Sequence, residues 1–552
     1  MRKWNAHMLK ICFTFSVILS SHTLYAETIT LTPKRQLTIE MVNKVASEQA
    51  SVTLSQDAKN NIKAGYDTVM QAALNNVPVY GLTVGVGWNK DHPVFHEVNG
   101  QRVLSSELVE LSQKFNQTSL RAHSSGLGQA LPVSTVRASM LIRLNTFLNG
   151  EAGISPALAQ QYVEFLNKGI TPVIPSQGSV GEADITLASH IGLAMIGEWN
   201  VVYQGKVQPS INVMNQLKIK PLQPIGKDFL SILSTNALMA ANAIDVLNQS
   251  KALYQKEVQL FALMLEGFNG NVAPFSESAL NARPYPEVQK AAADIRQALK
   301  GSDLWKPSSE RALQDPLSYR TMAYTLGEVR TANTELEKML LIQINHSDDN
   351  PLVLIAGLNT NDSTAQMQRY SIPGKASAAI VPTANFNFLP VTRAAAQLNE
   401  ALAKLAEIMT QQLIRTENPE FTKLPRFLAA KDNHGHAFGA IQKPFVTVNQ
   451  KIKLLAQPQW FMGATLAGNI EDTATMSNLT LENSQAIING LYDISAFQLL
   501  HAAQAVDLRE GFQLSQSSAQ LMKQYRQHVA FINQDIATTA LIEKSIPFWK
   551  QY

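Results

Sequence analysis

Long helical segments constrain the fold of this chain more than any other feature of its sequence. Residues 238–265 contain no proline, and residues 391–416 place apolar side chains at three- and four-residue steps. That spacing puts the apolar side chains on one face of an α-helix. Because such faces must be buried against one another, helices of this length predict a bundle. Further helices are expected at residues 136–148, 319–345 and 445–455.

Strand signals are few. Short stretches typical of strands occur at residues 51–54, 201–203 and 367–372. The pattern predicts a mainly α protein with a long central helix bundle and a mixed N-terminal region. The expected divisions are a leader at residues 1–26, an N-terminal region with glycine loops at residues 27–220, and a helical bundle at residues 221–552.

The leader has the features of a secretory signal peptide. Arg2, Lys3 and Lys10 precede an apolar run at residues 11–19, and the segment ends on a small residue. The run is shorter than the roughly 20 apolar residues of a membrane-spanning helix, which favours cleavage over anchoring. The only cysteine, Cys12, lies in this run. We therefore expect a periplasmic or secreted mature protein that has no thiol and no membrane association after cleavage.

Composition excludes several classes of site. Without a cysteine, the mature chain has no disulfide, thiolate nucleophile or cysteine metal site, and no metal site is expected. The whole chain has 46 Lys and Arg residues against 43 Asp and Glu residues, and the leader holds three of the basic ones. The mature protein is therefore balanced in charge, which does not favour nucleic acid as a partner.

Glycine clusters interrupt the helical pattern at residues 81–87, 124–128 and 178–181. Glycine allows the backbone to approach a ligand closely or to turn with positive φ, so each cluster is a candidate binding loop. The first cluster does not match a dinucleotide fingerprint, because no third glycine follows Gly85 and Gly87 at the required spacing.

Several short motifs stand out along the chain. They read YGLTVGVG at residues 80–87, AHSSGLG at 122–128, GSVG at 178–181, QDPLSYR at 314–320, NHSDDNP at 345–351, NF at 385–386 and NIED at 469–472. Together and in this order, they resemble the histidine, phenylalanine and tyrosine ammonia-lyases, the aromatic amino acid lyase family. The resemblance implies that family's fold, a carbon–nitrogen lyase activity, and a homotetramer whose active sites draw on three subunits.

The resemblance also assigns roles to individual residues. Eliminating an amine needs a base for the β proton, an anchor for the substrate carboxylate and a group near the departing nitrogen. Tyr80 is the candidate base, provided that its surroundings lower a phenol pKa from about 10. Arg320 is the candidate anchor, since its planar fork binds a carboxylate through two parallel hydrogen bonds. Glu471 is expected at the leaving nitrogen or at a polar substrate ring.

Other residues are expected around the substrate. His123 takes the place of a ring-contacting histidine and favours a polar ring, and Gln314, Asn345 and Phe386 fit other pocket positions. Tyr319 is a further catalytic candidate, because leucine replaces the tyrosine that the family carries two residues earlier. Each of these candidate site residues could instead have a structural role. The aromatic residues could pack in the core, the histidine and amides could form internal hydrogen bonds, and Arg320 could form an internal ion pair.

The chain departs from the family at the Ala-Ser-Gly tripeptide, from which these enzymes make 4-methylideneimidazol-5-one. Residues 178–184 read GSVGEAD, which is one residue shorter and has no serine after the second glycine. Residues 234–236 likewise replace the Asn-Gly-Thr block that supports this cofactor. The sequence therefore predicts that no such cofactor forms, whereas the candidate base Tyr80 and anchor Arg320 are retained.

A permanently charged leaving group removes the need for that electrophile. A trimethylammonium group has no N–H and no lone pair, is cationic at every pH, and departs as neutral trimethylamine. The chain thus resembles the cofactor-free ergothionase branch, and its expected partner is a small aromatic amino acid or betaine. Two alternatives remain: an ammonia-lyase or aminomutase that activates a free aromatic amino acid in another way, and an exported binding protein that has lost catalysis.

Overall fold

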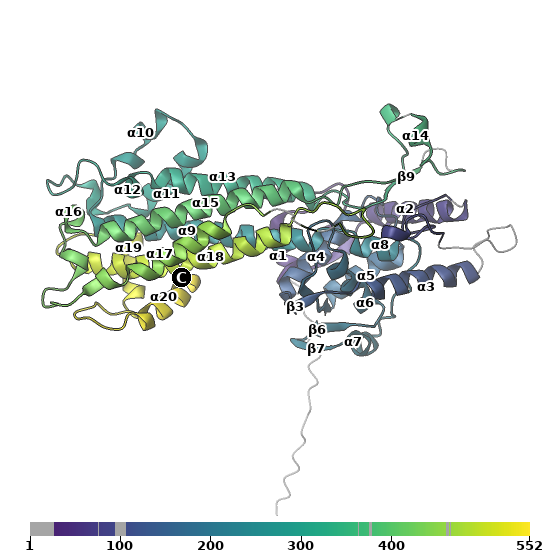
Figure 1. The fold of residues 1–552 in the computed structure, drawn as a ribbon, viewed down its shortest axis with the longest axis horizontal. Helices are drawn as coiled ribbons and strands as arrows, with labels where there is room; N and C mark the ends of the chain where they lie inside the picture. Colours follow the sequence, from purple (N-terminus) through teal and green to yellow (C-terminus); the bar gives the residue numbers. More distant parts are fainter. Residues whose placement is uncertain are drawn as a thin grey trace, which may run out of the picture.

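The structure is a computed structural model that describes residues 27–75, 77–93, 106–362, 364–374, 378–459, 463 and 465–552. The leader predicted at residues 1–26 lies outside the described residues. Figure 1 shows an elongated molecule, in which a long helical bundle adjoins a mixed region formed mainly by the first part of the chain. This arrangement confirms the predicted mainly α fold with a mixed N-terminal region.

Long helices lie side by side in the bundle (Figure 1). They are α9 (Ala237–Phe268), α13 (Met322–Gln343), α15 (Leu389–Thr416), α17 (Gln442–Leu455) and α18 (Ser477–Asp507). Shorter helices cover the bundle: α10 (Glu277–Asn281), α11 (Pro286–Ala298), α12 (Leu317–Arg320), α16 (Pro419–Thr422), α19 (Gln516–Tyr525) and α20 (Thr539–Gln551). The predicted bundle helices are confirmed, except that the helix expected at residues 319–345 is divided into α12 and α13 at Thr321.

The mixed region contains the remaining helices. They are α1 (Ile39–Ala46), α2 (Gln56–Leu74), α3 (Ser106–His123), α4 (Val133–Thr146), α5 (Pro156–Asn167), α6 (Ile185–Met195), α7 (Ser210–Leu217) and α8 (Asp228–Leu233). Local sequence explains where several of them begin. The side chain of Ser55 accepts a hydrogen bond from Ala58 N at the start of α2, and Ser155 does the same for Leu158 N at the start of α5.

The strands form small separate sheets. In one, β1 (Glu27–Leu31) pairs in parallel with β2 (Ala50–Leu54), with Glu27 opposite Ala50. The others are antiparallel: β3 (Leu127–Ala130) with β5 (Pro175–Gln177), β4 (Thr171–Pro172) with β6 (Asn200–Tyr203) and β7 (Lys206–Pro209), and β8 (Leu352–Leu354) with β9 (Ala379–Val381). The strands predicted at residues 51–54 and 201–203 are therefore confirmed.

The strand predicted at residues 367–372 is wrong. Residues 365–368 instead form the short helix α14 (Ala365–Gln368), whose start is capped by the Thr364 side chain, which accepts from Met367 N at 3.3 Å. Only Ser371 pairs as a strand residue, in an isolated bridge to Ala379. The threonine cap of a helical turn outweighs the weak strand propensity of this segment.

Helix α9 is the centre of the core. Most of its residues are buried, and it packs against α4 of the mixed region as well as α13 and α18 of the bundle. The main hydrophobic cluster includes Ile29 and Trp549, so one core crosses the division proposed near residue 220. In the described part of the chain, Asp228–Phe268 is long and apolar enough to cross a membrane, but 89% of its apolar window is buried inside the protein.

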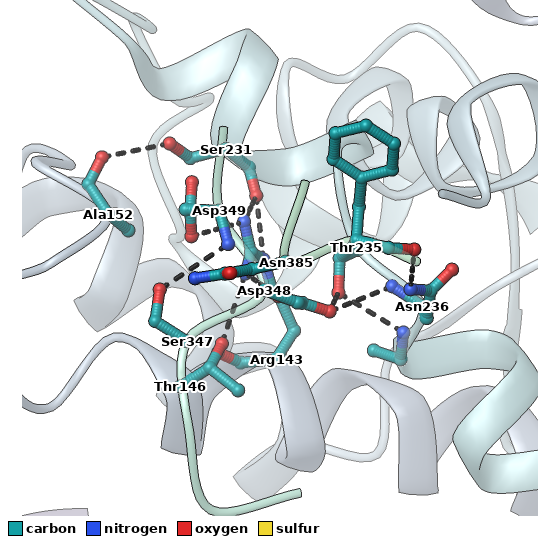
Figure 2. A network of polar contacts seen from close by, with 12 residues as sticks. Arg143, Thr146, Ala152, Ser231, Thr235, Asn236, Ser347, Asp348, Asp349 and Asn385 are labelled. Atoms are coloured by element: carbon teal, nitrogen blue, oxygen red, sulfur yellow. Dashed lines mark hydrogen bonds and ion pairs between the residues drawn. The ribbon is translucent and has the colours of Figure 1, made fainter. Parts of the chain in front are cut away.

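A buried charge network joins α4 to the start of α9 (Figure 2). The Arg143 guanidinium is 1% exposed and lies 2.8 Å from Asp348 Oδ1 and 2.9 Å from Asp349 Oδ2. Its Nε donates to the Ser231 carbonyl at the end of α8. Asp349 also lies 3.5 Å from the buried ammonium of Lys227. The network therefore fixes three segments that are distant in sequence.

We predict that Arg143→Met lowers the free energy of unfolding by about 3–5 kcal/mol, because two carboxylates would remain buried without their main cation. The measurement is a urea denaturation curve followed by circular dichroism. Arg121→Met is the matched control, since Arg121 forms an exposed ion pair with Glu198 and such pairs contribute little. Equal midpoints for the two variants would contradict a stabilising role for the Arg143 network.

Candidate active site

A pocket of about 300 Å³ lies in the mixed region and collects side chains from several segments. Its described lining comprises Tyr80, Val86, Gly87, His123, Gly178, Ser179, Val180, Glu182, Ala183, Ile185, Thr186, Leu230, Leu233, Leu466, Ala467 and Glu471. Three predicted site residues, Tyr80, His123 and Glu471, thus share one cavity although they are far apart in sequence. The first and third glycine clusters also contribute to its wall.

Tyr80 stands on a tight loop that is held by its own backbone. The N–H groups of Leu82 and Thr83 both donate to the Val79 carbonyl at 3.1 Å. Gly81 has a φ of +68°, and a Cβ there would lie 2.4 Å from the Leu230 side chain. Only glycine therefore allows both the turn and the close approach to α8. The loop returns so that Gly87 N donates to the Tyr80 hydroxyl at 2.8 Å.

Within this chain, the surroundings of Tyr80 do not lower its pKa. Burial raises the pKa of the Tyr80 phenol, and the Gly87 N–H lowers it by stabilising the phenolate. The negative charge of Glu471 raises it further. The net direction is upward. Tyr80 can act as a base only with a lowered pKa, and that would need a positive charge that these residues do not supply.

His123 ends α3 with its ring at the pocket. Its Nδ1 lies 2.7 Å from the Ser119 carbonyl, and a carbonyl can only accept, so Nδ1 carries the hydrogen. Nε2 is the ring nitrogen left for a ligand. When the ring is neutral, Nε2 is an acceptor, which suits a substrate ring that donates an N–H.

Glu471 comes from a turn in the C-terminal part of the chain, far in sequence from Tyr80 and His123. Leu466 and Glu471 form an isolated bridge, in which Leu466 N donates to the Glu471 carbonyl at 2.8 Å. The side chain is exposed and lines the pocket rather than packing in the core. Its negative charge adds to the effect of burial in raising the pKa of Tyr80.

The floor of the pocket is the loop that precedes α6. Gly181 has a φ of +88°, and a Cβ there would lie 2.3 Å from Thr475 Oγ1. The Ser179 hydroxyl donates to Asp184 Oδ1 and accepts from Gly181 N, both at 3.1 Å. Ala183 N donates to Asn236 Oδ1 at 3.1 Å. The loop is thus fixed on both sides, and its serine is used within the loop.

Asp184 joins this floor to the main helix. It is completely buried and accepts from Leu238 N and Met239 N at 3.1 Å, so it caps the start of α9. Burial raises the pKa of Asp184 to about 7, and its hydrogen bonds to those N–H groups and to Ser179 act in the opposite direction. The position of the pocket floor therefore depends on the N-terminus of α9.

Glu182 is a pocket residue to which the sequence analysis gave no role. Its half-buried carboxylate accepts from Asn387 Nδ2 at 3.1 and 3.3 Å and from the Thr475 N–H. Burial raises the pKa of Glu182 to about 7. The available signal was the change in residues 178–184, where Glu182 and Ala183 stand in place of the family's tripeptide.

Arg320 and Gln314 lie far from this pocket. Arg320 ends α12, at the bundle end away from the mixed region (Figure 1), and its Nη1 donates to Gln314 Oε1 at 2.6 Å. The neighbouring Tyr319 ring stacks on Phe268, the last residue of α9, whereas Asn236 at the start of α9 holds the pocket floor. A helix of 32 residues is roughly 48 Å long. One chain therefore cannot bring Arg320 to its own pocket.

The expected catalytic role of Tyr319 is corrected. Its side chain is 0% exposed, its ring lies 3.9 Å from that of Phe268, and its hydroxyl is 2.6 Å from Thr416 Oγ1. Burial raises the pKa of Tyr319 far above the normal phenol value. A tyrosine enclosed in this way packs the core of the bundle and cannot reach a substrate.

Asn345 and Phe386 also lie outside the described lining of the pocket. Asn345 accepts from Leu37 N at 2.7 Å and donates to the carbonyls of Leu37 and Leu341 at 2.9 Å, so its amide holds α13 to the chain before α1. The expectation that Asn345 binds substrate is corrected, because these contacts occupy the amide. Phe386 is half-buried, and its carbonyl accepts from Asn236 Nδ2.

The charge of the pocket is one-sided. Its described lining has two carboxylates, Glu182 and Glu471, and neither lysine nor arginine. Apolar walls from Ile185, Leu230 and Leu233 adjoin them. In the described residues, no group of three or more His, Cys, Asp or Glu side chains is placed to hold a metal ion. The pocket is therefore suited to an organic group that carries positive charge.

Comparison with known proteins agrees with the sequence motifs. The sequence profile of the aromatic amino acid lyases matches residues 37–527. A histidine ammonia-lyase from Treponema denticola is 29% identical over 501 residues, which cover 90% of this chain and 92% of that protein.

Solved structures give the same result. The ergothioneine-degrading enzyme ergothionase from Treponema denticola, in complex with desmethyl-ergothioneine sulfonic acid, superimposes with a TM-score of 0.87 at 34% identity, covering 95% of this chain and 99% of that one. Tyrosine aminomutase from Streptomyces globisporus superimposes with a TM-score of 0.80 at 25% identity, covering 95% and 97%. The chain belongs to the aromatic amino acid lyase family and is a carbon–nitrogen lyase.

Proposed function

We propose that this lyase eliminates trimethylamine from the trimethylammonium betaine of an aromatic amino acid, as an ergothionase does, and that it does so without 4-methylideneimidazol-5-one. The observation that carries this proposal is the charge of the pocket. Glu182 and Glu471 face a cavity with apolar walls and no cation among the described lining residues. A trimethylammonium group needs both features, because its charge is permanent and its surface is made of methyl groups.

The pocket floor supports a reaction without that cofactor. Forming it requires a serine that loses water and a glycine nitrogen that closes the ring. Residues 181–184 are Gly, Glu, Ala and Asp, and the nearby Ser179 hydroxyl is bonded to Asp184. The residues at this place therefore do not fit the group, and the proposed reaction does not use it.

Tyr80 acts as the base in the proposed reaction. The phenolate oxygen takes the β proton, the C–H electron pair forms the Cα–Cβ double bond, and the C–N pair leaves with neutral trimethylamine. The pKa of Tyr80 is raised in the free pocket, but a bound quaternary ammonium brings a fixed positive charge that favours the phenolate. Gly87 N–H, which already donates to the Tyr80 oxygen at 2.8 Å, stabilises the same charged form.

The substrate carboxylate requires a cation from outside the described pocket. We propose that Arg320 and Gln314 of a neighbouring copy provide this anchor in a homotetramer with composite sites. Two findings support this: α9 separates Arg320 from the pocket of its own chain, and Gln314 already orients the guanidinium at 2.6 Å. We also propose that residues 1–26 direct export to the periplasm or the medium.

The substrate assay tests the proposal directly. Purified protein is incubated with ergothioneine, histidine betaine, histidine, tyrosine and phenylalanine, and released trimethylamine and ammonia are measured separately. We expect trimethylamine from a betaine and no ammonia from the free amino acids. Ammonia release would instead identify an ammonia-lyase with another activation, and no amine from any compound would favour a binding protein.

We predict that Tyr80→Phe lowers turnover by roughly 10²- to 10⁴-fold on the substrate so identified, the range for loss of a positioned acid–base group. The ring that packs at the loop remains, so thermal unfolding should change little. A substrate deuterated at the β carbon should show a kinetic isotope effect with the native enzyme. Near-native turnover of the variant would eliminate Tyr80 as the base.

We predict that two inactive variants complement one another. Tyr80→Phe and Arg320→Ala chains, co-expressed with different affinity tags and purified as mixed oligomers, should recover about a quarter of native activity. That recovery arises because a composite site takes its tyrosine from one chain and its arginine from another. Mixing the two separately purified homo-oligomers without subunit exchange is the control. Mixed oligomers that stay inactive would contradict a site shared between chains.

A further inference from the structure

Glu182 is held in the pocket by groups that leave its charge uncompensated. Both carboxylate oxygens accept from the Asn387 amide at 3.1 and 3.3 Å, the Thr475 N–H donates to the same carboxylate, and the backbones of Glu182 and Asn387 form an isolated bridge. All these donors are neutral. Among the described residues, the groups that act on Glu182 include no lysine or arginine, and its side chain is half-buried.

Glu182 differs from a buried structural carboxylate such as Asp184 because it lines a cavity that a ligand can enter. A half-buried carboxylate without a cation is costly to ionise, and a bound cation would favour its charged form. The raised pKa of Glu182, about 7, reflects that same burial. Two rigid donors nevertheless orient the carboxylate, and it lines the cavity instead of turning to solvent. Arg320 of a neighbouring copy is assigned to the substrate carboxylate, so the positive charge beside Glu182 is expected from the ligand's own cationic group.

The two carboxylates of the pocket also differ in position. The turn that carries Glu471 adjoins the Tyr80 loop, because a Cβ at Gly87 would lie 3.7 Å from the Ala467 side chain, so Glu471 belongs to the side of the pocket where a proton would be removed. Glu182 is tied to Asn387 and Thr475, and the apolar side chain of Ile185 follows three residues later on the pocket wall. An elimination removes a proton from one carbon and an amine from the adjacent carbon, so it needs one pocket group near each of these two carbons.

We propose that Glu182, oriented by Asn387 and Thr475, binds the quaternary ammonium of the substrate and so determines the specificity of the site for a positively charged leaving group. The inference rests on the proposed function. Glu182 stands where related enzymes carry the tripeptide that becomes their electrophile. The electrophile attracts the lone pair of a substrate amine, whereas a carboxylate at this place attracts a substrate cation. The apolar walls accept the methyl groups, and Glu182 supplies the charge.

A pair of ligands with equal shape and different charge tests this assignment. Choline and 3,3-dimethylbutan-1-ol differ in having nitrogen or carbon at the centre of three methyl groups, so the ratio of their dissociation constants measures the preference for charge alone. Calorimetry or ligand-observed NMR on the full-length mature protein gives both constants. We expect the native protein to prefer choline, and Glu182→Gln to reduce that preference by about tenfold or more.

Matched variants separate charge from packing. Glu182→Asp keeps the charge and should restore part of the preference that Glu182→Gln loses. Asn387→Ala removes the orienting amide and should weaken choline binding less than Glu182→Gln does. Glu198→Gln is the control, because Glu198 is an exposed carboxylate paired with Arg121 outside the described pocket lining. Circular dichroism and thermal unfolding establish that each variant is folded.

The outcomes distinguish this inference from the proposed function. A folded Glu182→Gln protein that keeps the native preference for choline overturns the inference, as does a native protein without any such preference. If the native enzyme releases trimethylamine and Glu182→Gln leaves KM for the betaine unchanged, the function stands and the role of Glu182 fails. If no betaine is cleaved but the choline preference still depends on Glu182, the cation site stands and the function fails.

Discussion

The buried N-terminus of α9 is the constraint on which the rest of the structure depends. A helix that starts inside a protein exposes N–H groups that water cannot reach, and each must find an acceptor. Asp348 Oδ2 accepts from Asn236 N at 2.8 Å, Thr235 Oγ1 accepts from Ala237 N at 3.1 Å, and Asp184 accepts from the next two. These acceptors come from three segments, so satisfying one helix end also brings the Arg143 network and the pocket floor together.

This link explains how the family fold can keep its architecture while the residues of the pocket floor change. The loop at residues 178–184 is anchored by Asp184 beneath it and by Asn236 beside it, and neither contact depends on which residues face the cavity. Glu182 and Ala183 can therefore replace the family's tripeptide without disturbing the core. The pocket therefore has one carboxylate, that of Glu182, at the place of the family's tripeptide, and this supports the proposed cationic leaving group.

The length of α9 has a second consequence, for the distribution of the site between chains. The same helix supports the pocket at its first residues and the Arg320 end of the bundle at its last, with roughly 48 Å between them. With Arg320 as the proposed carboxylate anchor, one chain carries the two parts of the proposed substrate site at opposite ends of α9. The proposed site is then completed only by another copy, so the proposed catalysis depends on association of chains.

The sequence by itself determined the long helices, the family, and the membership of Tyr80, His123 and Glu471 in three motifs that the fold brings to one cavity. Hydrophobic periodicity and the order of motifs are read directly from the sequence, because they do not depend on which residues become neighbours in the folded protein. Tertiary structure alone decided which polar residues remain available to a ligand. Tyr319 is buried against Phe268, and Asn345 is occupied by the backbone at Leu37. Glu182 faces a pocket whose described lining contains no lysine or arginine. Each outcome depends on partners far away in sequence, because burial and hydrogen bonding are settled by packing and not by the residue type.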